Sequence, residues 1–261
     1  AGCSAAISAA RQGKKVILVE DSGILGGQAT LGLVTPLSSI RSRSGKPFGG
    51  LIDEICGEVK RLSGEYCVPD KSEVGDRIAA PHILKYVLLK LCREAGVTVL
   101  FHTRLIGADT ENGRVARVIV AGKSRLTVIE SKVFIDATGD GDLMYRAGIP
   151  TVERGNYHSY FPFAITLDSC RKAAETGKIA NAISGVSGGY ASLYGENHPK
   201  DIPLYHGTSS DEVNRYLIAN QLELLNKLKK DDRNSRDVVT LPGMCQFRTV
   251  RHIAGAYTLL E

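Results

Sequence analysis

The first residues whose types and spacing suggest chemistry are a glycine and an acid that flank a predicted helix and strand. Gly2 opens an alanine-rich helical segment, and Glu20 ends the apolar run of residues 15–20, 18 residues after the glycine. In a dinucleotide-binding unit, the last glycine lets helix and strand pack closely, and an acid about 20 residues later accepts hydrogen bonds from a ribose. The spacing therefore predicts half of a nucleotide-binding βαβ unit. The alternative is an ordinary surface helix followed by an ordinary strand.

A second junction carries the strongest signal in the sequence. Residues 132–136 are predicted to form an apolar strand, which runs directly into Ala137-Thr138-Gly139-Asp140-Gly141-Asp142. Small residues there would leave backbone N–H groups uncovered at the carboxyl edge of a parallel sheet, where doubly wound folds bind ligands. We expect Asp140 or Asp142 to cap a helix beginning near Leu143. The alternative is a Mg²⁺ or Ca²⁺ site made by the two carboxylates.

The elements that would position these residues alternate between helix and strand up to about residue 150. Periodicity and turn signals predict helices over 3–12, 50–62 and 81–95, parallel-type strands over 15–20, 97–101 and 132–136, and an antiparallel meander over 105–109, 115–121 and 126–129. Residues 63–80 read as a polar link. Beyond Gly148, we expect a strand over 157–167 and a long helix over 211–230 capped by Ser209 or Ser210. The aromatic residues Tyr160, Phe161 and Phe163 would stack on a ligand or be buried in a core.

The composition excludes several classes of protein. The 33 Lys and Arg exceed the 28 Asp and Glu by a net charge of +5, but the basic residues are dispersed, so nucleic acid is a poor candidate partner. No run of the sequence is apolar enough to span a membrane. The six cysteines form no CxxC pair, which disfavours a local zinc or iron–sulfur site and favours reduced thiols in a cytoplasmic protein.

Taken together, these motifs resemble the FAD-dependent oxidoreductases of the glutathione-reductase-like superfamily, and within it the heterodisulfide reductase A-like group. The likeness rests on Glu20, on the loop Leu25-Gly26-Gly27-Gln28-Ala29-Thr30, on the inserted meander, on residues 133–142 and on residues 248–257. It implies an α/β fold: a Rossmann-like FAD/NAD(P)-binding parallel sheet with an inserted antiparallel β-meander, plus a second α+β cap region. The strand and glycines before Gly2 and the last flavin-binding stretch of the group lie outside residues 1–261, so we expect a fragment of a longer polypeptide.

The resemblance also assigns roles to residues. Gly2 would face the pyrophosphate of FAD and Glu20 its adenosine ribose, while Leu105 would lie near the adenine through its backbone. The remaining residues implied to contact the cofactor are Gly26, Gly27, Gln28 and Thr30 beside the pyrophosphate and flavin, and Thr138, Gly139 and Asp140 over the nucleotide. The domains would be an incomplete FAD-binding domain over 1–150, a substrate or cap region over 151–240, and a segment over 241–261 that returns to the first domain.

Candidate catalytic residues lie near the end of the sequence. The resemblance implies that Arg248 and Arg251 lie on the substrate side of the flavin, where guanidinium groups bind a carboxylate or stabilise negative charge. His252 would exchange a proton near neutral pH. The alternative is that both arginines pair with acids on the domain surface. The group has Glu, Ser and Arg where this chain has Thr249, Val250 and His252, so its substrate does not transfer.

These observations predict an enzyme that transfers a hydride or electrons between an unidentified substrate and FAD. The partner would be a small-molecule substrate or an electron-transfer protein. A 4Fe-4S cluster is implied only by the resemblance, because the spacing of the cysteines does not support one here. Two alternatives remain: a flavin-binding subunit that passes electrons without catalysis, and a relative that uses the same flavin fold for tRNA modification or thiazole synthesis. The sequence does not specify the substrate, the electron acceptor or the oligomeric state.

Overall fold

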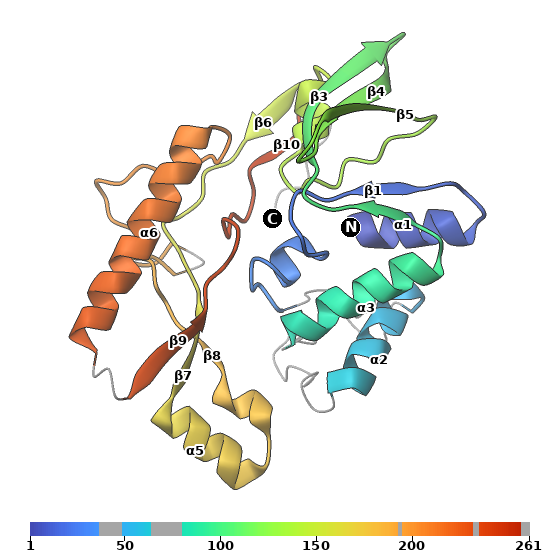
Figure 1. Ribbon diagram of the computed structural model, residues 1–261. Coiled ribbons are helices and arrows are strands. Elements are labelled where there is room, and N and C mark those ends of the chain that lie inside the picture. The colour runs from blue at the N-terminus through green and yellow to red at the C-terminus, as the bar shows by residue number, and fades with distance from the viewer. Residues whose placement is uncertain (37–48, 64–79, 193–194, 232–234, 257–261) are drawn as a thin grey trace. The chain divides into compact units, whose positions relative to one another are not determined.

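The computed structural model describes residues 1–36, 49–63, 80–192, 195–231 and 235–256 (Figure 1). The chain divides into two compact units. Unit 1 comprises residues 1–25, 88–155 and 248–261, and unit 2 comprises residues 26–87 and 156–247. The structure is a mixed α/β protein with small parallel and antiparallel sheets. The functional division at residues 150 and 240 stays a prediction.

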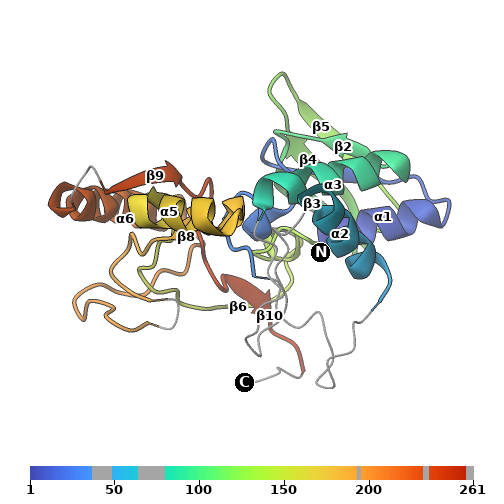
Figure 2. The same ribbon diagram turned by 90° about the horizontal axis from the view of Figure 1, so that it is seen from below.

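Unit 1 opens with the predicted helix and strand. Helix α1 spans Gly2–Arg11 and ends where Gly13 adopts a φ of 74°, which a residue without a Cβ reaches at little cost. Strand β1 (Ile17–Val19) pairs in parallel with β2 (Thr98–Leu100). Helix α3 (Pro81–Glu94) leads into β2, and its C-terminal half lies beside α1 in both views (Figures 1 and 2). These elements confirm the helix-and-strand alternation expected for the first hundred residues.

The expected antiparallel meander is present in unit 1. Strand β4 (Arg114–Ala121) lies between β3 (Arg104–Glu111) and β5 (Leu126–Glu130), and both pairings are antiparallel. Asn112 and Gly113 both have positive φ, as a tight hairpin turn of this kind requires. Val118, Val120 and Leu143 form the buried centre beneath the sheet. The core of unit 1 therefore joins the meander to helix α4 (Asp142–Arg146).

The strand predicted over residues 132–136 is wrong. This segment has no regular secondary structure, and no described strand pairs with it. Phe134 packs against the meander core, whereas Val133 and Ile135 are 71% and 62% exposed. An apolar run forms a strand only where a neighbour supplies backbone hydrogen bonds. The next strand of unit 1, β6 (Thr151–Glu153), instead pairs antiparallel with β10 (Arg251–Ile253).

Unit 2 combines a small sheet with several helices. Its sheet has the order β8-β7-β9, built from β7 (Phe163–Thr166), β8 (Ser184–Gly185) and β9 (Arg236–Thr240). The helical elements are α2 (Leu51–Ser63), α5 (Leu167–Thr176), α6 (Ser210–Lys230) and the short 3-10 helices Gly27–Ala29 and Ile179–Ala182. The strand expected over 157–167 is thus limited to its last part. Residues 64–79, most of the expected polar link, lie outside the described residues.

The long helix of unit 2 begins where the sequence predicts. The side chain of Ser209 accepts a hydrogen bond from the backbone N–H of Glu212, which caps the first turn of α6. Its buried residues are Tyr216, Asn220 and Leu224, and Tyr160 is buried in the same unit. Tyr160 is therefore buried in a core, which is one of the two alternatives that the sequence analysis gives for it. Within the described part of the chain, no helix combines the length and apolarity needed to cross a bilayer.

Candidate functional site

The candidate site of unit 1 is built around the close approach of Gly2 to Ala137. A Cβ placed on Gly2 would lie 3.1 Å from the Cβ of Ala137 and 3.6 Å from Cδ1 of Leu18. The missing side chain thus lets the start of α1 contact both β1 and the junction that follows residue 136. Two motifs 135 residues apart in sequence are neighbours because the first of them begins with glycine.

The first turn of α1 is suited to an anion. It contains no acidic residue, and no side chain caps its backbone N–H groups. Helix N-termini carry a partial positive charge, and their free N–H groups bind phosphate oxygens. The contact between Gly2 and Ala137 places this turn beside the junction.

Glu20 ends the same strand that Gly2 packs against. Its backbone N–H donates to the carbonyl of Leu100 at 2.9 Å, which holds it at the carboxyl end of the parallel pair. Its Oε1 accepts hydrogen bonds from the backbone N–H and hydroxyl of Ser22, at 2.9 and 2.7 Å. Among the described residues, Oε2 has no hydrogen-bond donor. Glu20 is half-buried, so one carboxylate oxygen is held in place while the other is available to a ligand.

The junction is organised by Asp136, which the sequence analysis did not single out. Oδ1 of Asp136 accepts from the backbone N–H and the hydroxyl of Thr138, and Oδ2 accepts from the backbone N–H of Met144. The hydroxyl oxygen of Thr138 in turn accepts from the backbone N–H of Asp142 at 3.0 Å. Thr138 and Asp136 therefore satisfy the first turn of α4. The expectation that Asp140 or Asp142 caps this helix is wrong, because its N-cap is Gly141 and Asp142 lies inside the first turn.

Gly139 and Asp140 lie between Thr138 and helix α4 in the sequence. Gly139 is exposed, with a φ of 88° and no atom within 4 Å of the position of a Cβ. Burial, followed by the negative charges of Asp142 and Asp136, raises the pKa of the Asp140 carboxyl from 3.8 to about 6, against the opposing effect of Arg251. Part of the Asp140 population is therefore protonated near neutral pH and is able to donate a hydrogen bond.

Arg251 is the best-anchored of the three candidate catalytic residues. Its guanidinium, 6% exposed, pairs with Asp142 at 2.6 Å and lies 4.4 Å from the ring centroid of Tyr145. It also lies 4.0 Å from Glu153. Arg251 therefore pairs with acids, as the alternative in the sequence analysis states.

The other two candidates lie on either side of Arg251 in sequence. His252 belongs to β10 and pairs with Val152 in the antiparallel ladder with β6. Arg248 is exposed on the segment that leads into β10.

Four of the predicted cofactor residues lie in unit 2. Gly26 and Gly27 have positive φ and form the turn into a short 3-10 helix. Nε2 of Gln28 donates to the carbonyl of Cys245 at 2.7 Å, while its Oε1 is buried without a partner in the described part of the protein. The hydroxyl of Thr30 is directed to the carbonyl of Gly27 at 3.4 Å.

Gln246 holds this loop and was missed by the sequence analysis. Its Nε2 donates to the carbonyl of Gly32 at 2.7 Å, and its Oε1 accepts from the backbone N–H of Phe161 at the same distance. Gln246 is 7% exposed. Its partners Gly32 and Phe161 lie 214 and 85 positions away, so no local signal in the sequence marked this residue.

Leu105 packs in the core of the meander. Its side chain contacts the cluster of Val118, Val120 and Leu143, and its backbone lies opposite Val120 in the sheet. The expected contact of its backbone with adenine stays a prediction.

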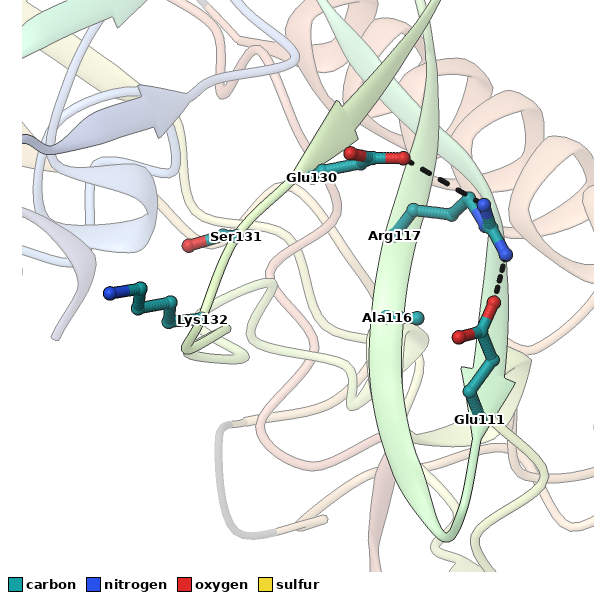
Figure 3. Close-up of a pocket in the computed structure, with 6 residues that line it drawn as sticks. All are labelled: Glu111, Ala116, Arg117, Glu130, Ser131 and Lys132. Atoms are coloured by element: carbon teal, nitrogen blue, oxygen red, sulfur yellow. Dashed lines mark hydrogen bonds and ion pairs between the residues drawn. The ribbon is translucent and has the colours of Figure 1, made fainter.

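A separate hollow opens on the outer part of the meander (Figure 3). Its volume is about 430 Å³, and it is lined by Glu111, Ala116, Arg117, Glu130, Ser131 and Lys132. Arg117 points between Glu111 and Glu130 and pairs with both acids (Figure 3). The hollow shares no residue with the predicted cofactor site. Its mutually paired charges are typical of a solvated sheet surface.

Comparison with known families assigns the chain to one of them. Residues 1–164 match the family model described as FAD dependent oxidoreductase, which is more than half of the chain. The chain belongs to the FAD-dependent oxidoreductase family. The match covers Gly2, Glu20 and residues 136–140, whereas Arg248, Arg251 and His252 lie outside it. No curated protein matches the sequence closely enough to add to this family assignment.

Solved structures show distant likeness to this family member. The myxobacterial chondrochloren halogenase CndH is 14% identical, with a TM-score of 0.46 over 63% of this chain and 41% of the halogenase. THI4 from Thermovibrio ammonificans is 19% identical, with a TM-score of 0.40 over 59% of this chain and 61% of that protein. L-proline dehydrogenase from P. horikoshii is 16% identical, with a TM-score of 0.45 over 87% and 75%. The chain thus spans less than two thirds of the first two proteins.

The residues of unit 1 fit the adenosine and pyrophosphate part of a FAD. The uncapped first turn of α1 suits the pyrophosphate, the available oxygen of Glu20 suits a ribose hydroxyl, and the space above Gly139 admits a ligand. No group of three or more metal-ligating side chains is assembled within the ranges that the structure describes.

Proposed function

We propose that this chain is the cofactor-binding part of an enzyme that transfers a hydride or electrons between a small-molecule substrate and FAD. The observation that carries the proposal is the contact of Gly2 with Ala137, which joins the uncapped turn of α1 to the open backbone at Gly139. Membership of the FAD-dependent oxidoreductase family supports it. When bound, FAD supplies the redox chemistry, because its isoalloxazine ring accepts or releases the hydride.

The residues of unit 1 would hold the nucleotide end of the cofactor. In this proposal, N–H groups of the first turn of α1 bind the pyrophosphate and Oε2 of Glu20 accepts from a ribose hydroxyl. Asp140, with its raised pKa, donates a proton in a hydrogen bond to an oxygen of the ligand. Thr138 keeps Gly139 in place through its bonds to Asp136 and Asp142. Gly26, Gly27, Gln28 and Thr30 remain proposed cofactor contacts, on the resemblance of their loop alone.

The roles on the substrate side follow from the contacts of Arg251. Because its guanidinium is occupied by Asp142 and Tyr145, we propose that Arg251 acts mainly by positioning the segment around it. Arg248 would then bind an anionic group of the substrate, and His252 would exchange a proton. The heterodisulfide reductase A-like group is our proposal for the subgroup, supported by residues 133–142 and 248–256.

The test begins with the purified full-length protein. Its absorption between about 350 and 500 nm reports bound flavin, and anaerobic bleaching by candidate donors reports turnover. Flavin that bleaches with a small-molecule donor supports the enzyme. Flavin that bleaches only with a partner protein would instead identify an electron-transfer subunit, and absence of flavin after reconstitution with FAD would refute the proposal.

Two pairs of variants locate the cofactor. Glu20→Ala is expected to weaken FAD retention by about 1–3 kcal/mol through lost hydrogen bonds to the ribose. Glu175→Ala, which removes an exposed acid of α5, is its control and leaves retention unchanged. Gly139→Leu is expected to block the cofactor. Gly148→Leu is matched to it, because Gly148 also has positive φ, of 77°, and open space at its Cβ. Equal flavin content in the two leucine variants would contradict the contact at Gly139.

A further inference from the structure

Helix α6, the long helix of unit 2 in Figure 1, carries apolar side chains on the side that faces solvent. Ile218, Leu222 and Leu225 follow one another at intervals of four and three residues, and they are 60%, 55% and 44% exposed. Residues three and four apart are neighbours on a helix surface, so these three side chains form one continuous outer stripe. The outward face of a surface helix is normally polar, and a contiguous apolar patch there indicates a partner.

Opposite charges lie at the two ends of the outer stripe. Asp211 is in the first turn of α6 and Lys229 is in the last turn, and both are exposed. They are 18 positions apart, which is about five turns of 3.6 residues, so they lie on the same side of the helix. Leu222 comes 11 positions after Asp211 and seven before Lys229, close to three and two turns. The acid, the stripe and the base are therefore in line.

We propose that the outer stripe of α6 binds the outer stripe of a second copy of this chain, with the two helices antiparallel. A two-fold axis level with Asn220 brings Ile218 opposite Leu222 of the second copy and Asp211 opposite Lys229 of the second copy. Each of these pairs occurs twice, because a two-fold axis repeats every contact. The apolar centre of the interface is thus flanked at both ends by an acid and a base.

The charges favour this orientation over a parallel one. A parallel second copy would place Asp211 beside Asp211 and Lys229 beside Lys229, and like charges at close range repel. The antiparallel pair also aligns the positive end of each helix dipole with the negative end of the other. The stripe therefore fits a second, inverted copy of the same helix.

The side chains around the outer stripe are compatible with this pairing. Nε of Arg215 donates to the carbonyl of Asp211 in its own helix at 3.4 Å. In the antiparallel pair Arg215 comes opposite Leu225 of the second copy, where its hydrocarbon stem covers the leucine and its charge stays in water. The exposed residues that flank the stripe are uncharged: Asn214, Gln221 and Asn226. Their burial at the rim of the interface leaves no unpaired charge.

The size of the stripe indicates a weak dimer. Three apolar side chains from each copy form its centre, and interfaces below about 1,200 Å² are weak or transient. We expect a dissociation constant of about 10–100 µM at low salt, which rises with salt because exposed charge pairs are screened. The proposal does not rest on the proposed function, because no residue of α6 has a role in that function.

Sedimentation of the full-length protein measures the association and identifies the surface. Leu222→Gln removes the central apolar contact and is expected to weaken association about tenfold. Leu126→Gln is the matched control, because Leu126 is a 66% exposed leucine on β5 of unit 1, and it leaves association unchanged. Loss of association in both variants to the same extent would contradict the choice of α6.

Exchange of the two charges tests the register. Asp211→Lys puts two bases opposite each other at both ends of the interface, and Lys229→Asp puts two acids there, so each variant alone should associate about tenfold more weakly than the wild type. In an equimolar mixture, every acid again faces a base, and we expect a heterodimer with nearly the affinity of the wild-type dimer. Recovery on mixing reports the pairing itself, because local damage to the helix would persist in the mixture.

Three outcomes would overturn the proposal. One is a wild-type protein that stays monomeric at about 100 µM, whether the stripe is covered by another part of the chain or by nothing. Another is a dimer that survives Leu222→Gln, which would place the contact on a different surface. The third is a mixture of the charge variants that associates no better than either one alone. Wild-type sedimentation and Leu222→Gln decide the surface even where a charge variant does not fold.

Discussion

Arg251 donates to Asp142 at 2.6 Å, which fastens strand β10 to the first turn of helix α4 across 109 residues of sequence. The guanidinium is almost fully buried and also lies over the ring of Tyr145. The same turn follows Asp140, so the pair connects the predicted catalytic segment to the predicted cofactor edge within unit 1. An arginine held by an acid and an aromatic ring has little freedom to follow a substrate.

The first prediction concerns this anchor. Arg251→Lys is expected to destabilise unit 1 by about 2 kcal/mol, because lysine loses the planar contact with Tyr145 and the geometry of the bond to Asp142. Arg248→Lys, at the exposed position, is expected to change stability by less than about 0.5 kcal/mol. Urea unfolding measures both, and turnover of the flavin-loaded enzyme is measured in parallel. If Arg251→Lys left stability unchanged and abolished turnover, Arg251 would be a catalytic residue rather than a positioning residue.

The second prediction concerns the contact of Gly2 with Ala137. Gly2→Ala puts a methyl group 3.1 Å from the Cβ of Ala137, so the junction must shift by a few tenths of an ångström. We expect FAD affinity to fall about tenfold, which corresponds to about 1.4 kcal/mol. Gly57→Ala is the matched helical control in α2, since no atom lies within 4 Å of its Cβ position.

The control variant Gly57→Ala is expected to increase the stability of the protein. Alanine is favoured over glycine inside a helix by about 0.5–1 kcal/mol, so this variant should be slightly more stable with unchanged FAD affinity. Fluorescence titration with FAD measures the affinities and thermal unfolding measures the stabilities. Equal affinity in the two alanine variants would contradict the role of Gly2.

The parts of this fold that the sequence predicted are those whose signals are local. Gly13 marks the end of helix α1, Asn112 and Gly113 mark the hairpin turn, and Ser209 marks the start of α6. Each of these residues lies within a few positions of the boundary that it predicts. Hydrophobic periodicity adds the helices and the meander between such signals. The close packing at Gly2 was also predictable, because the last glycine of a dinucleotide-binding turn lets the helix that it begins pack closely against the sheet.

The parts that the sequence missed depend on distant partners. Residues 132–136 have the apolar run of a buried strand, yet a strand forms only where another backbone pairs with it. The pairing of β6 with β10 joins residues about 100 positions apart, and the bond of Gln246 to Gly32 spans 214 positions. Asp136 was missed for a different reason: its side chain bonds nearby backbone, but Asp140 and Asp142 offered the same cap to the same helix. A local sequence pattern does not show which of several nearby acids will cap a helix.

The third prediction follows from the raised pKa of Asp140. In the folded protein this carboxyl titrates at about 6 instead of 3.8, so the folded state binds more protons than the unfolded state between these values. Its favourable contribution is complete below pH 3.8 and is lost as the pH rises through 6. Asp140→Asn is therefore expected to stabilise unit 1 at pH 7 by about 1–3 kcal/mol and to flatten this part of the pH profile.

The pKa of Asp140 can also be tested through the protons taken up when the cofactor binds. The negative charge of the pyrophosphate would raise its pKa further, so FAD binding at pH 6.5 should take up a fraction of a proton. Calorimetry in two buffers of different ionisation enthalpy measures this uptake. It is expected to vanish in Asp140→Asn and to persist in Asp168→Asn, which removes an exposed acid of α5. Identical uptake in both variants would place the titrating group elsewhere.

The fourth prediction concerns His158 in unit 2. The residue is fully buried, and neither ring nitrogen has a hydrogen-bond partner in the described part of the protein. Burial lowers the pKa of His158, and the nearby His198 lowers it further; Glu223 opposes this effect and Lys227 adds to it. The unfolded state therefore binds a proton at a higher pH than the folded state. The stability that depends on neutral His158 is present above pH 6.5 and is lost as the pH falls through the lower, folded-state pKa.

His158→Phe removes this titration while keeping an aromatic ring against Tyr190 and Tyr205. We expect the loss of stability between pH 7 and 5 to become smaller, and stability at pH 7 to be equal or slightly higher, because phenylalanine leaves no buried nitrogen unpaired. Hydrogen exchange of the α6 backbone measures the stability of unit 2 separately from unit 1. His206→Gln, at an exposed position, is the control and keeps the wild-type slope. An unchanged slope in His158→Phe would show that another group causes the acid sensitivity of unit 2.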